Sequence, residues 1–341
     1  MISLPALTNC LGIILSLAFT MGINEHPADT GNPKKNFNDT LLTHQQGIHF
    51  PGEPFVSSDT PSCVIPFNKA GNLIIIQAKV DSIEGNFILD TGAPGLILNM
   101  TYFRNYPSSE ADMQSDESGG ITGDVTVSNP TDVTKLKLGP ITWSRIQAGR
   151  INLGHIENSK GIKVLGLLGM QLFKRFEMII DYENNLIYLH LINKKEIKTY
   201  KHDMLKDTSL YNEFPIDIKD NKLYTYGEMA GKKLTFIIDT GAESNVLDSR
   251  LPDKIFENVT ITSRIMLAGT GNTKVEALTG EMKKMKMANL EISSLPVLVT
   301  NLEKMCKAYD DHCLDGMLGF DFLSMHKIGF NFVNRKMYIW K

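Results

Sequence analysis

The sequence has almost no excess of charge of either sign. Its 35 Lys and Arg residues nearly balance 38 Asp and Glu residues, which leaves a net charge of −3 over 341 residues. A chain without a basic excess gives no reason to expect a nucleic acid or an anionic membrane surface as a partner. The eight histidines show neither a metal-binding spacing nor the pattern of a nucleophile–base triad. We therefore expect no metal and no cofactor.

Cysteine is also scarce, with four residues in the chain. Cys306 and Cys313 flank the polar segment Lys-Ala-Tyr-Asp-Asp-His, which favours a small disulfide-closed loop over two free thiols. Cys63 then has no partner. A zinc site would need more ligands than these cysteines and the neighbouring His312.

The N-terminal region carries an apolar run at residues 11–19, which is too short to span a bilayer comfortably. Its length is typical of a secretory signal peptide, although no Lys or Arg precedes it. We predict a signal peptide over residues 1–23 and export to the periplasm or the medium; the alternatives are a frayed terminus or an uncleaved anchor. Residues 24–60 are rich in Asn, Pro, Thr, His and Gly and are expected to form a flexible arm.

One short unit occurs twice in the chain. Asn-Phe-Ile-Leu-Asp90-Thr-Gly-Ala is repeated as Thr-Phe-Ile-Ile-Asp239-Thr-Gly-Ala, 149 residues further on. A carboxylate at the end of a buried strand is costly unless it is hydrogen-bonded or paired. Two such carboxylates in equivalent positions are expected to meet across a pseudo-two-fold axis. A third Asp-Thr-Gly, at residues 29–31, has no apolar strand on either side and is interpreted as linker.

The repeat extends well beyond this unit. Gly166-Leu-Leu-Gly is matched by Gly316-Met-Leu-Gly, and Ile65-Pro-Phe is matched by Phe214-Pro-Ile, with nearly the same spacing. Two copies of one unit are too few for a solenoid and indicate a duplicated lobe. Asp181 is replaced by Asn331 in the other half, so we interpret it as a surface or turn carboxylate.

The chain therefore divides into lobe 1 (residues 61–193), a linker (194–210) and lobe 2 (211–341). Many short strands separated by turns predict an all-β fold of two similar closed β-barrels, because closed barrels leave no exposed edges. The expected strands include residues 73–80, 86–89, 135–138, 292–299 and 336–340, with a turn at 81–85 and short helices at 170–176 and 320–326.

The duplicated motifs resemble those of aspartic proteases of the pepsin and retroviral type, and most nearly the bacterial retropepsin-like group, here as a tandem over residues 63–341. The resemblance implies two lobes with one active site between them, and a peptide or protein as substrate. It also implies that the apolar-apolar-Gly segments at 167–169 and 317–319 cross behind the Asp loops and support them. By the same resemblance, the hydroxyls of Thr91 and Thr240 tie the two loops together.

The chemistry follows from the residue types. Two carboxyls about 3 Å apart cannot both ionise, so Asp90 and Asp239 are expected to hold one proton between them. The ionised member takes a proton from a bound water and the neutral member donates to the substrate oxygen. Gly92 and Gly241 allow the tight turns that bring N–H groups towards the carboxylates. A single Asp-Thr-Gly after a strand is more often a plain turn; the repeat favours catalysis.

Three features beside the motifs bear on activity. Ala93 and Ala242 stand where pepsin-like enzymes carry Ser or Thr, which agrees with the retroviral pattern. Glu243 is expected to place a further carboxylate near the site and to perturb the pair. A mobile flap is expected about thirty residues past each Asp loop; an ordinary surface hairpin is the alternative. The residues assigned to these flaps are Gly120, Ile121, Thr122, Gly269 and Thr270.

The predicted function is therefore that of an exported, monomeric aspartic endopeptidase. One alternative keeps the fold with an idle dyad, as a peptide-binding protein. Another has each lobe pairing with its counterpart in a second molecule, which would give a homodimer with two sites.

Overall fold

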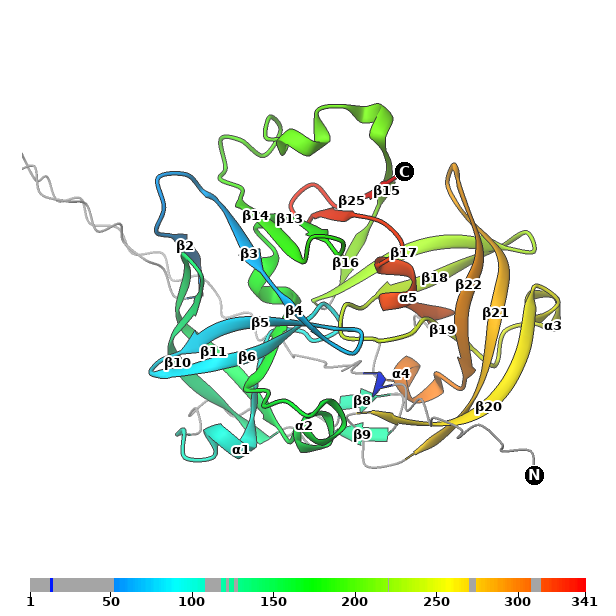
Figure 1. Cartoon of the computed structure of the whole chain (residues 1–341), viewed down its shortest axis with the longest axis horizontal. Helices are drawn as coiled ribbons and strands as arrows, with labels where there is room; N and C mark the ends of the chain where they lie inside the picture. The colour runs from blue at the N-terminus through cyan, green and yellow to red at the C-terminus, as the bar shows by residue number, and fades with distance from the viewer. Residues whose placement is uncertain are drawn as a thin grey trace, which may run out of the picture.

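The computed structural model describes residues 13–14, 52–107, 118–120, 123–125, 128–219, 221–269, 274–307 and 314–341. Within these ranges most of the ordered structure is β-strand, with short helices between the strands (Figure 1). The strands form two rings, one from each half of the chain, and a third sheet to which both halves contribute. The all-β class and the two similar closed lobes predicted from the repeat are thus confirmed.

The ring of lobe 1 runs in the order β10-β11-β7-β12-β6-β5 and closes through a pairing of β10 with β5. Its strands are β5 (Leu73–Val80), β6 (Ile83–Asp90), β7 (Leu96–Asn99), β10 (Ser128–Leu138), β11 (Ile141–Ile151) and β12 (Gly166–Gly169). Two strands extend its edges, β2 (Pro54–Val56) and β4 (Asn68–Ala70). A two-stranded hairpin also belongs to this half, with β8 (Ser118–Gly120) and β9 (Gly123–Val125).

The ring of lobe 2 has the corresponding order β21-β22-β19-β23-β18-β17. Its strands are β17 (Lys222–Met229), β18 (Lys232–Ile238), β19 (Val246–Asp248), β21 (Val275–Met287), β22 (Leu290–Thr300) and β23 (Gly316–Leu318). At its edges lie β16 (Asp217–Lys219), β20 (Val259–Gly269) and the short β1 (Ile13–Ile14), which runs parallel to the end of β20. The ring closes where Glu228 of β17 pairs with Lys286 of β21. The closing pair of lobe 1 is Lys79 with Lys137, and each of these residues lies 149 positions before its counterpart in lobe 2.

A six-stranded sheet joins the lobes and was not part of the predicted two-barrel architecture. Its order is β15 (Tyr211–Pro215), β25 (Lys336–Trp340), β24 (Ile328–Asn331), β13 (Phe176–Asp181), β14 (Leu186–Leu191) and β3 (Ser62–Pro66). The central strands β13 and β24 are antiparallel, with Ile179 opposite Gly329. Because these two residues are equivalent in the repeat, the pseudo-two-fold relation passes through this pair. The sequence similarity of these strands was visible, but nothing local shows that they leave the barrels.

The helices are short, as expected. They are α1 (Met100–Phe103), α2 (Gly154–Lys160), α3 (Asp253–Phe256), α4 (Glu303–Lys307) and α5 (Phe320–Leu323), with 3₁₀ turns η1 (Met170–Phe173), η2 (Asp203–Leu205) and η3 (Thr208–Leu210). The helices predicted at 170–176 and 320–326 are therefore a 3₁₀ turn and a single α-turn. None of the described helices is long and apolar enough to cross a membrane.

Several predicted elements need correction. The turn expected at residues 81–85 occupies only two residues, because Asp81 takes a left-handed conformation (φ 52°) and β6 already begins at Ile83. Glu84 and Gly85 were interpreted as turn residues because one is polar and the other is small. Both belong to β6 and pair with β5. Residues 54–56, placed in the flexible arm, form β2 and pair with β11. The linker packs against the joining sheet, since Glu177 of β13 accepts a hydrogen bond from the His202 N–H.

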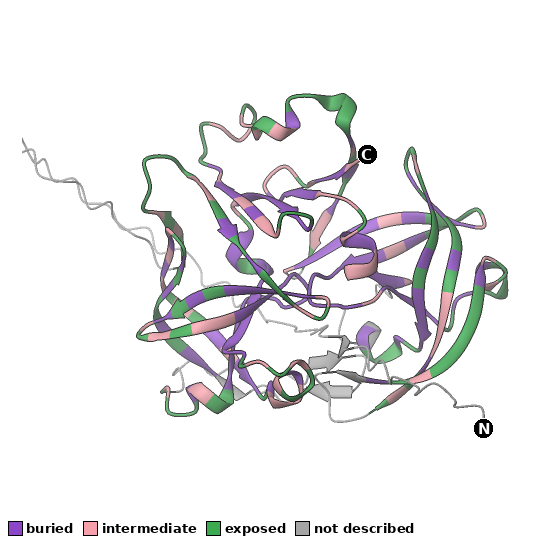
Figure 2. Cartoon of the chain, viewed as in Figure 1, coloured by how far each residue is buried: buried purple, intermediate pink, exposed green. Residues whose placement is uncertain are grey.

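The largest apolar cluster runs from lobe 1 through the joining sheet into lobe 2. Figure 2 shows buried residues concentrated where the two rings and this sheet meet, with exposed residues on the outer strands and turns. Two smaller clusters lie behind the repeated motifs, one containing Ala93 with Leu167 and the other Ala242 with Met317. Burial of apolar side chains, which contributes about 25 cal/mol per Å², thus fixes both motif loops from behind.

The apolar-apolar-Gly strands support the motif loops, as the resemblance implied. β12 runs parallel to β6 and antiparallel to β7, and β23 does the same with β18 and β19. Gly169 ends β12 and Gly319 directly follows β23, with ordinary negative φ values of −90° and −109°. A Cβ at Gly169 would lie 2.6 Å from the Ala93 carbonyl oxygen, and one at Gly319 would lie 2.6 Å from the Ala242 carbonyl oxygen.

We predict that Gly169→Ala and Gly319→Ala each lower the free energy of unfolding by about 2–3 kcal/mol, because the obstructing atoms are backbone and cannot rotate away. Denaturant titration of the full chain measures this. Gly231→Ala is the matched control: its φ is +77° but a Cβ there has open space, so it should cost only about 1 kcal/mol of conformational strain. Equal costs at all three positions would contradict the steric explanation.

Candidate active site

The two repeated aspartates lie at equivalent ends of two buried strands. Asp90 is the last residue of β6, and Asp239 directly follows β18. The residues directly before each aspartate are apolar and buried, and both aspartates are 0% exposed. The strands lie in different lobes, so the two loops that follow them meet between the lobes.

Reciprocal hydrogen bonds join the two loops. The Thr91 N–H donates to the Thr240 hydroxyl oxygen at 3.0 Å, and the Thr240 N–H donates to the Thr91 hydroxyl oxygen at 3.0 Å. Each hydroxyl in turn donates across the interface, Thr91 to the Ile238 carbonyl (2.8 Å) and Thr240 to the Leu89 carbonyl (2.9 Å). The side chains have the loop-tying geometry that the resemblance implied for them.

Each motif glycine lies against the carboxyl group of the opposite lobe. A Cβ at Gly92 would lie 2.6 Å from the carboxyl carbon of Asp239, and one at Gly241 would lie 2.6 Å from the carboxyl carbon of Asp90. No side chain fits at either position. The glycines therefore let each loop close over the other aspartate. This reason for glycine, unlike the tight turn, cannot be predicted from the local sequence.

The carboxyl groups are held by backbone donors on one oxygen only. Asp90 Oδ1 accepts hydrogen bonds from the Gly92 and Ala93 N–H groups at 2.9 Å, and Asp239 Oδ1 accepts one from the Gly241 N–H at 2.8 Å. Among the described residues, no group donates to the Oδ2 atom of either aspartate. These two buried oxygens are the groups on which a proton, a water or a substrate atom would be held.

Burial dominates the acidity of the pair. It raises the pKa of Asp90 well above its ordinary value, with a further contribution from the negative charge of Asp239, against the opposing N–H groups of Ala93 and Gly92. Burial likewise raises the pKa of Asp239 to about 6, while the Gly241 N–H acts in the opposite direction. Two carboxyls in this position cannot both ionise at low cost. The pair titrates as one unit.

The side chains of Ala93 and Ala242 contribute no hydrogen-bond donor to the pair. Both are 0% exposed, each within one of the apolar clusters behind the loops. The methyl groups pack where a Ser or Thr would carry a hydroxyl, and the Oδ2 atoms are without a protein donor. This agrees with the expectation that the aspartates lack the side-chain hydrogen bond that lowers a carboxyl pKa.

The role expected for Glu243 was wrong. Its carboxylate does not stand as an uncompensated charge beside the aspartates, because Lys160 of lobe 1 lies 2.7 Å from both of its oxygens. The sequence gives no signal for this partner, which is 83 residues away on a short helix. Glu243 therefore supplies a contact between the lobes rather than a perturbation of the pair.

The proposed flaps are described only in part. Gly120 ends β8 and pairs with Gly123 of β9, so a hairpin is present there, while Ile121 and Thr122 lie outside the described residues. Gly269 ends β20, and Thr270 also lies outside them. The β8 strand contacts α4 of lobe 2 (Figure 1). The lobe 1 hairpin therefore reaches across to the other lobe, as a covering flap requires.

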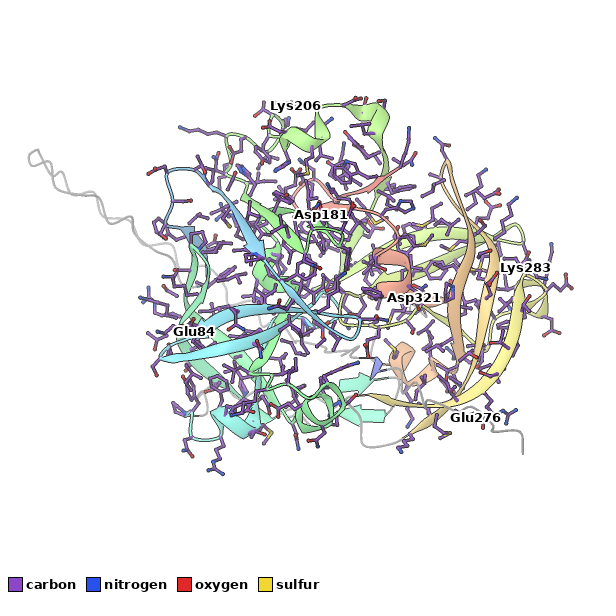
Figure 3. The ribbon with its side chains drawn as sticks, viewed as in Figure 1. Glu84, Asp181, Lys206, Glu276, Lys283 and Asp321 are labelled. Carbon is purple, nitrogen blue, oxygen red and sulfur yellow. The ribbon has the colours of Figure 1, made fainter. Side chains whose placement is uncertain are left out.

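The remaining candidate residues play no part in the pair. Cys306 belongs to α4, and its expected partner Cys313 lies outside the described residues; Cys63 carries a free thiol. Asp181 (Figure 3) is the last residue of β13 and is buried, not at the surface; it forms an ion pair with Lys327 at 2.8 Å. In the described part of the chain no group of His, Cys, Asp and Glu residues could hold a metal ion.

Comparison with known proteins gives a family match over part of lobe 2. Residues 225–322 match the family model described as aspartyl protease, a segment that contains Asp239 and the supporting strand β23. This match supports a protease-type function. The crystal structure of Basic 7S globulin from soybean is similar over 85% of this chain and 95% of that chain, with 11% identity and a TM-score of 0.42. A comparison with curated proteins found no match.

We predict that Thr91→Val, which removes the hydroxyl but keeps the shape, lowers the free energy of unfolding by about 1–3 kcal/mol. It leaves the buried Thr240 N–H without its acceptor. Thermal and denaturant unfolding measure this loss. Thr91→Ser retains the hydroxyl and is expected to remain close to wild type. A Ser variant as unstable as the Val variant would show that the methyl packing, not the hydrogen bond, matters.

Proposed function

We propose that this protein is an aspartic endopeptidase that hydrolyses peptide bonds with a water activated between Asp90 and Asp239. The observation that carries the proposal is the pair of buried carboxyl groups from equivalent loops of two lobes, each with one oxygen free of protein donors. Burial and mutual charge favour one shared proton. Such a pair contains both a base and an acid.

The reaction follows from that single proton. A water bound between the carboxyls gives a proton to the ionised member as its oxygen attacks the peptide carbonyl carbon. The neutral member donates its proton to the carbonyl oxygen, so the tetrahedral intermediate carries no net charge from that oxygen. As the intermediate collapses, the protonated carboxyl donates to the leaving nitrogen, the ionised carboxyl takes a proton from a hydroxyl of the intermediate, and the C–N bond breaks. The pair then again holds one proton, and neither residue forms a covalent bond with the substrate.

One chain supplies both aspartates in this arrangement, which favours a monomeric enzyme with one site. The joining sheet supports this reading, because β13 of lobe 1 pairs directly with β24 of lobe 2 of the same chain. A homodimer built from like lobes would have to replace that pairing. We further propose that the protein is exported under the direction of residues 1–23 and acts on peptides or proteins outside the cytoplasm.

We predict that Asp90→Asn and Asp239→Asn each reduce kcat by at least about 10²-fold, because neither the acid nor the base can be spared. Cleavage of a diverse peptide library, with and without pepstatin, measures the loss. A variant that kept more than about a tenth of wild-type kcat would show that its aspartate is not catalytic. If the wild type bound peptides but cleaved none, the chain would be a peptide-binding protein with an idle pair.

The thermal stability of the same two Asn variants provides a control for correct folding. A carboxyl whose pKa is raised on folding stabilises the protein below its unfolded pKa, and this contribution is lost as the pH rises through the folded pKa. For Asp239 that window runs from its ordinary value of 3.8 to about 6. The Asn variants lack this loss, so their Tm at neutral pH should equal or exceed that of the wild type. A much lower Tm would make their inactivity uninformative.

We predict that kcat/KM peaks at mildly acidic to near-neutral pH. Burial raises the pKa of both aspartates, so the singly protonated pair persists at higher pH than an ordinary aspartate would allow. A peak below about pH 3.5, lower than the pKa of an unperturbed Asp, would contradict this. Replacing Ala93 and Ala242 by Ser should move the profile to lower pH, since a hydroxyl donor favours the ionised carboxylate.

A further inference from the structure

A buried ion pair connects the lobes beside the active site. Lys160 of lobe 1 lies 2.7 Å from both carboxylate oxygens of Glu243 in lobe 2, and the two side chains are 10% and 8% exposed. Asn72 of lobe 1 adds two hydrogen bonds: its N–H donates to Glu243 Oε1 at 3.0 Å, and its side-chain amide donates to the Glu243 carbonyl oxygen at 3.2 Å. Glu243 thus meets lobe 1 through both side chain and backbone.

The lobe 1 partners are held rigidly. Lys160 is the last residue of α2, which Gly161 closes in a left-handed conformation with its N–H bonded to the Glu157 carbonyl. The Glu157 carboxylate fixes the following loop by accepting from the Val164 N–H at 2.9 Å. Ile156 of the same helix is fully buried in the apolar cluster that contains Ala93. The Lys160 ammonium group is therefore placed relative to the Asp90 loop.

The turn that carries Asn72 is shaped for this contact. Gly71, between β4 and β5, has φ +60°, and a Cβ there would lie 2.8 Å from both Glu243 Oε1 and Lys160 Nζ. No side chain could occupy that space without displacing the ion pair. In Figure 1 this turn extends from lobe 1 towards the centre of the molecule. Two separate segments of lobe 1, this turn and the end of α2, thus converge on one carboxylate.

Glu243 is close in sequence to Asp239, so its contact with lobe 1 affects how that aspartate is held. It lies four residues after Asp239, in the loop that carries the second carboxyl. Breaking a buried ion pair leaves an uncompensated charge and is strongly destabilising, so the loop stays docked on lobe 1. The equivalent residue of lobe 1 is Pro94, which has no charge. Pro94 cannot form the equivalent ion pair with lobe 2, so the contact requires two unlike lobes.

We propose that Lys160, Glu243 and Asn72 form an interlobe clamp that positions the Asp239 loop against lobe 1, with Lys160 and Glu243 as positioning residues for the aspartate pair. The clamp also selects the pairing of lobe 1 with lobe 2, since two copies of lobe 1 would bury two lysines without a carboxylate. The catalytic part of this inference rests on the proposed peptidase function; the structural part does not.

The test compares Lys160→Met with wild type in the full chain. Displacing a catalytic group by about 1 Å can cost about 10²-fold in rate, so kcat per pepstatin-titrated site should fall about 10- to 100-fold. Amide hydrogen exchange at Thr91 and Thr240 should become at least about tenfold faster, because the loops they join are less firmly docked. A merely stabilising ion pair would lower Tm without changing kcat per titrated site.

Matched variants separate the clamp from a general loss of charge. Lys284→Met removes the lysine of the ion pair with Glu291, also 2.7 Å long but 58% and 56% exposed, and should leave both measurements unchanged. The exchanged pair Lys160→Glu with Glu243→Lys should restore much of what either single change loses. If Lys160→Met fails to fold, Glu243→Gln keeps the shape and removes the charge, and should show the same changes to a smaller degree.

The outcomes distinguish the clamp from the proposed function. An active wild type whose Lys160→Met and Glu243→Gln variants keep their kcat and exchange rates would overturn the clamp and leave the peptidase standing. A wild type that cleaves no peptide would overturn the peptidase, while faster exchange at Thr91 and Thr240 in the variant would still support the clamp.

Discussion

The reciprocal hydrogen bonds between Thr91 and Thr240 are the contact on which the rest of the structure depends. Two buried carboxyl groups repel one another once both ionise, and nothing in either lobe alone would hold them together. Each threonine satisfies a backbone N–H of the other lobe and donates to one of its carbonyls. Backbone is thereby bonded to backbone through two short side chains, so the loops have little freedom to separate.

The strands, apolar clusters and shared sheet around the two loops stabilise that contact. The strands β12 and β23 fill the space behind the loops, and the apolar clusters around Ala93 and Ala242 exclude water from their backs. The joining sheet sets the orientation of the two lobes through β13 and β24. Burial raises the pKa of both aspartates, so the pair retains one proton to a higher pH than an ordinary aspartate would.

The two halves have nevertheless diverged behind their motif loops. The Gly169 N–H donates to the backbone carbonyl of Gly95, whereas the Gly319 N–H donates to the side chain of Asn245. Asn245 also donates to the Pro296 carbonyl, which ties the lobe 2 loop to β22. A pair of identical lobes could not have acquired such differences independently. The two halves of one chain can, because each has its own sequence.

Much of the fold was predictable because it depends on local patterns. Apolar strands ending in Asp-Thr-Gly define β6 and β18 by themselves, and the 149-residue offset relates one half to the other. The aspartates, threonines and glycines of the site were predicted for the same reason.

The rest depends on contacts between distant residues. Glu243 was misjudged because its partner Lys160 lies on a helix that no periodicity reveals. The joining sheet escaped prediction because strands in barrels and strands in a shared sheet carry the same alternation of side chains. Asp181 was interpreted as a surface or turn carboxylate, but it is buried at the end of β13, where Lys327 compensates its charge.

The central claim is that Asp90 and Asp239 share one proton as a single coupled unit. Carbon-13 NMR of the carboxyl groups of labelled aspartate, followed as a function of pH in the full-length protein, tests it most directly. The account predicts two linked titration steps that both carboxyl signals follow, with both pKa values above the ordinary value of 3.8. In Asp90→Asn the Asp239 signal should lose the linked second step. Two independent titrations near the ordinary pKa, or an Asp239 signal unaffected by the loss of Asp90, would contradict it.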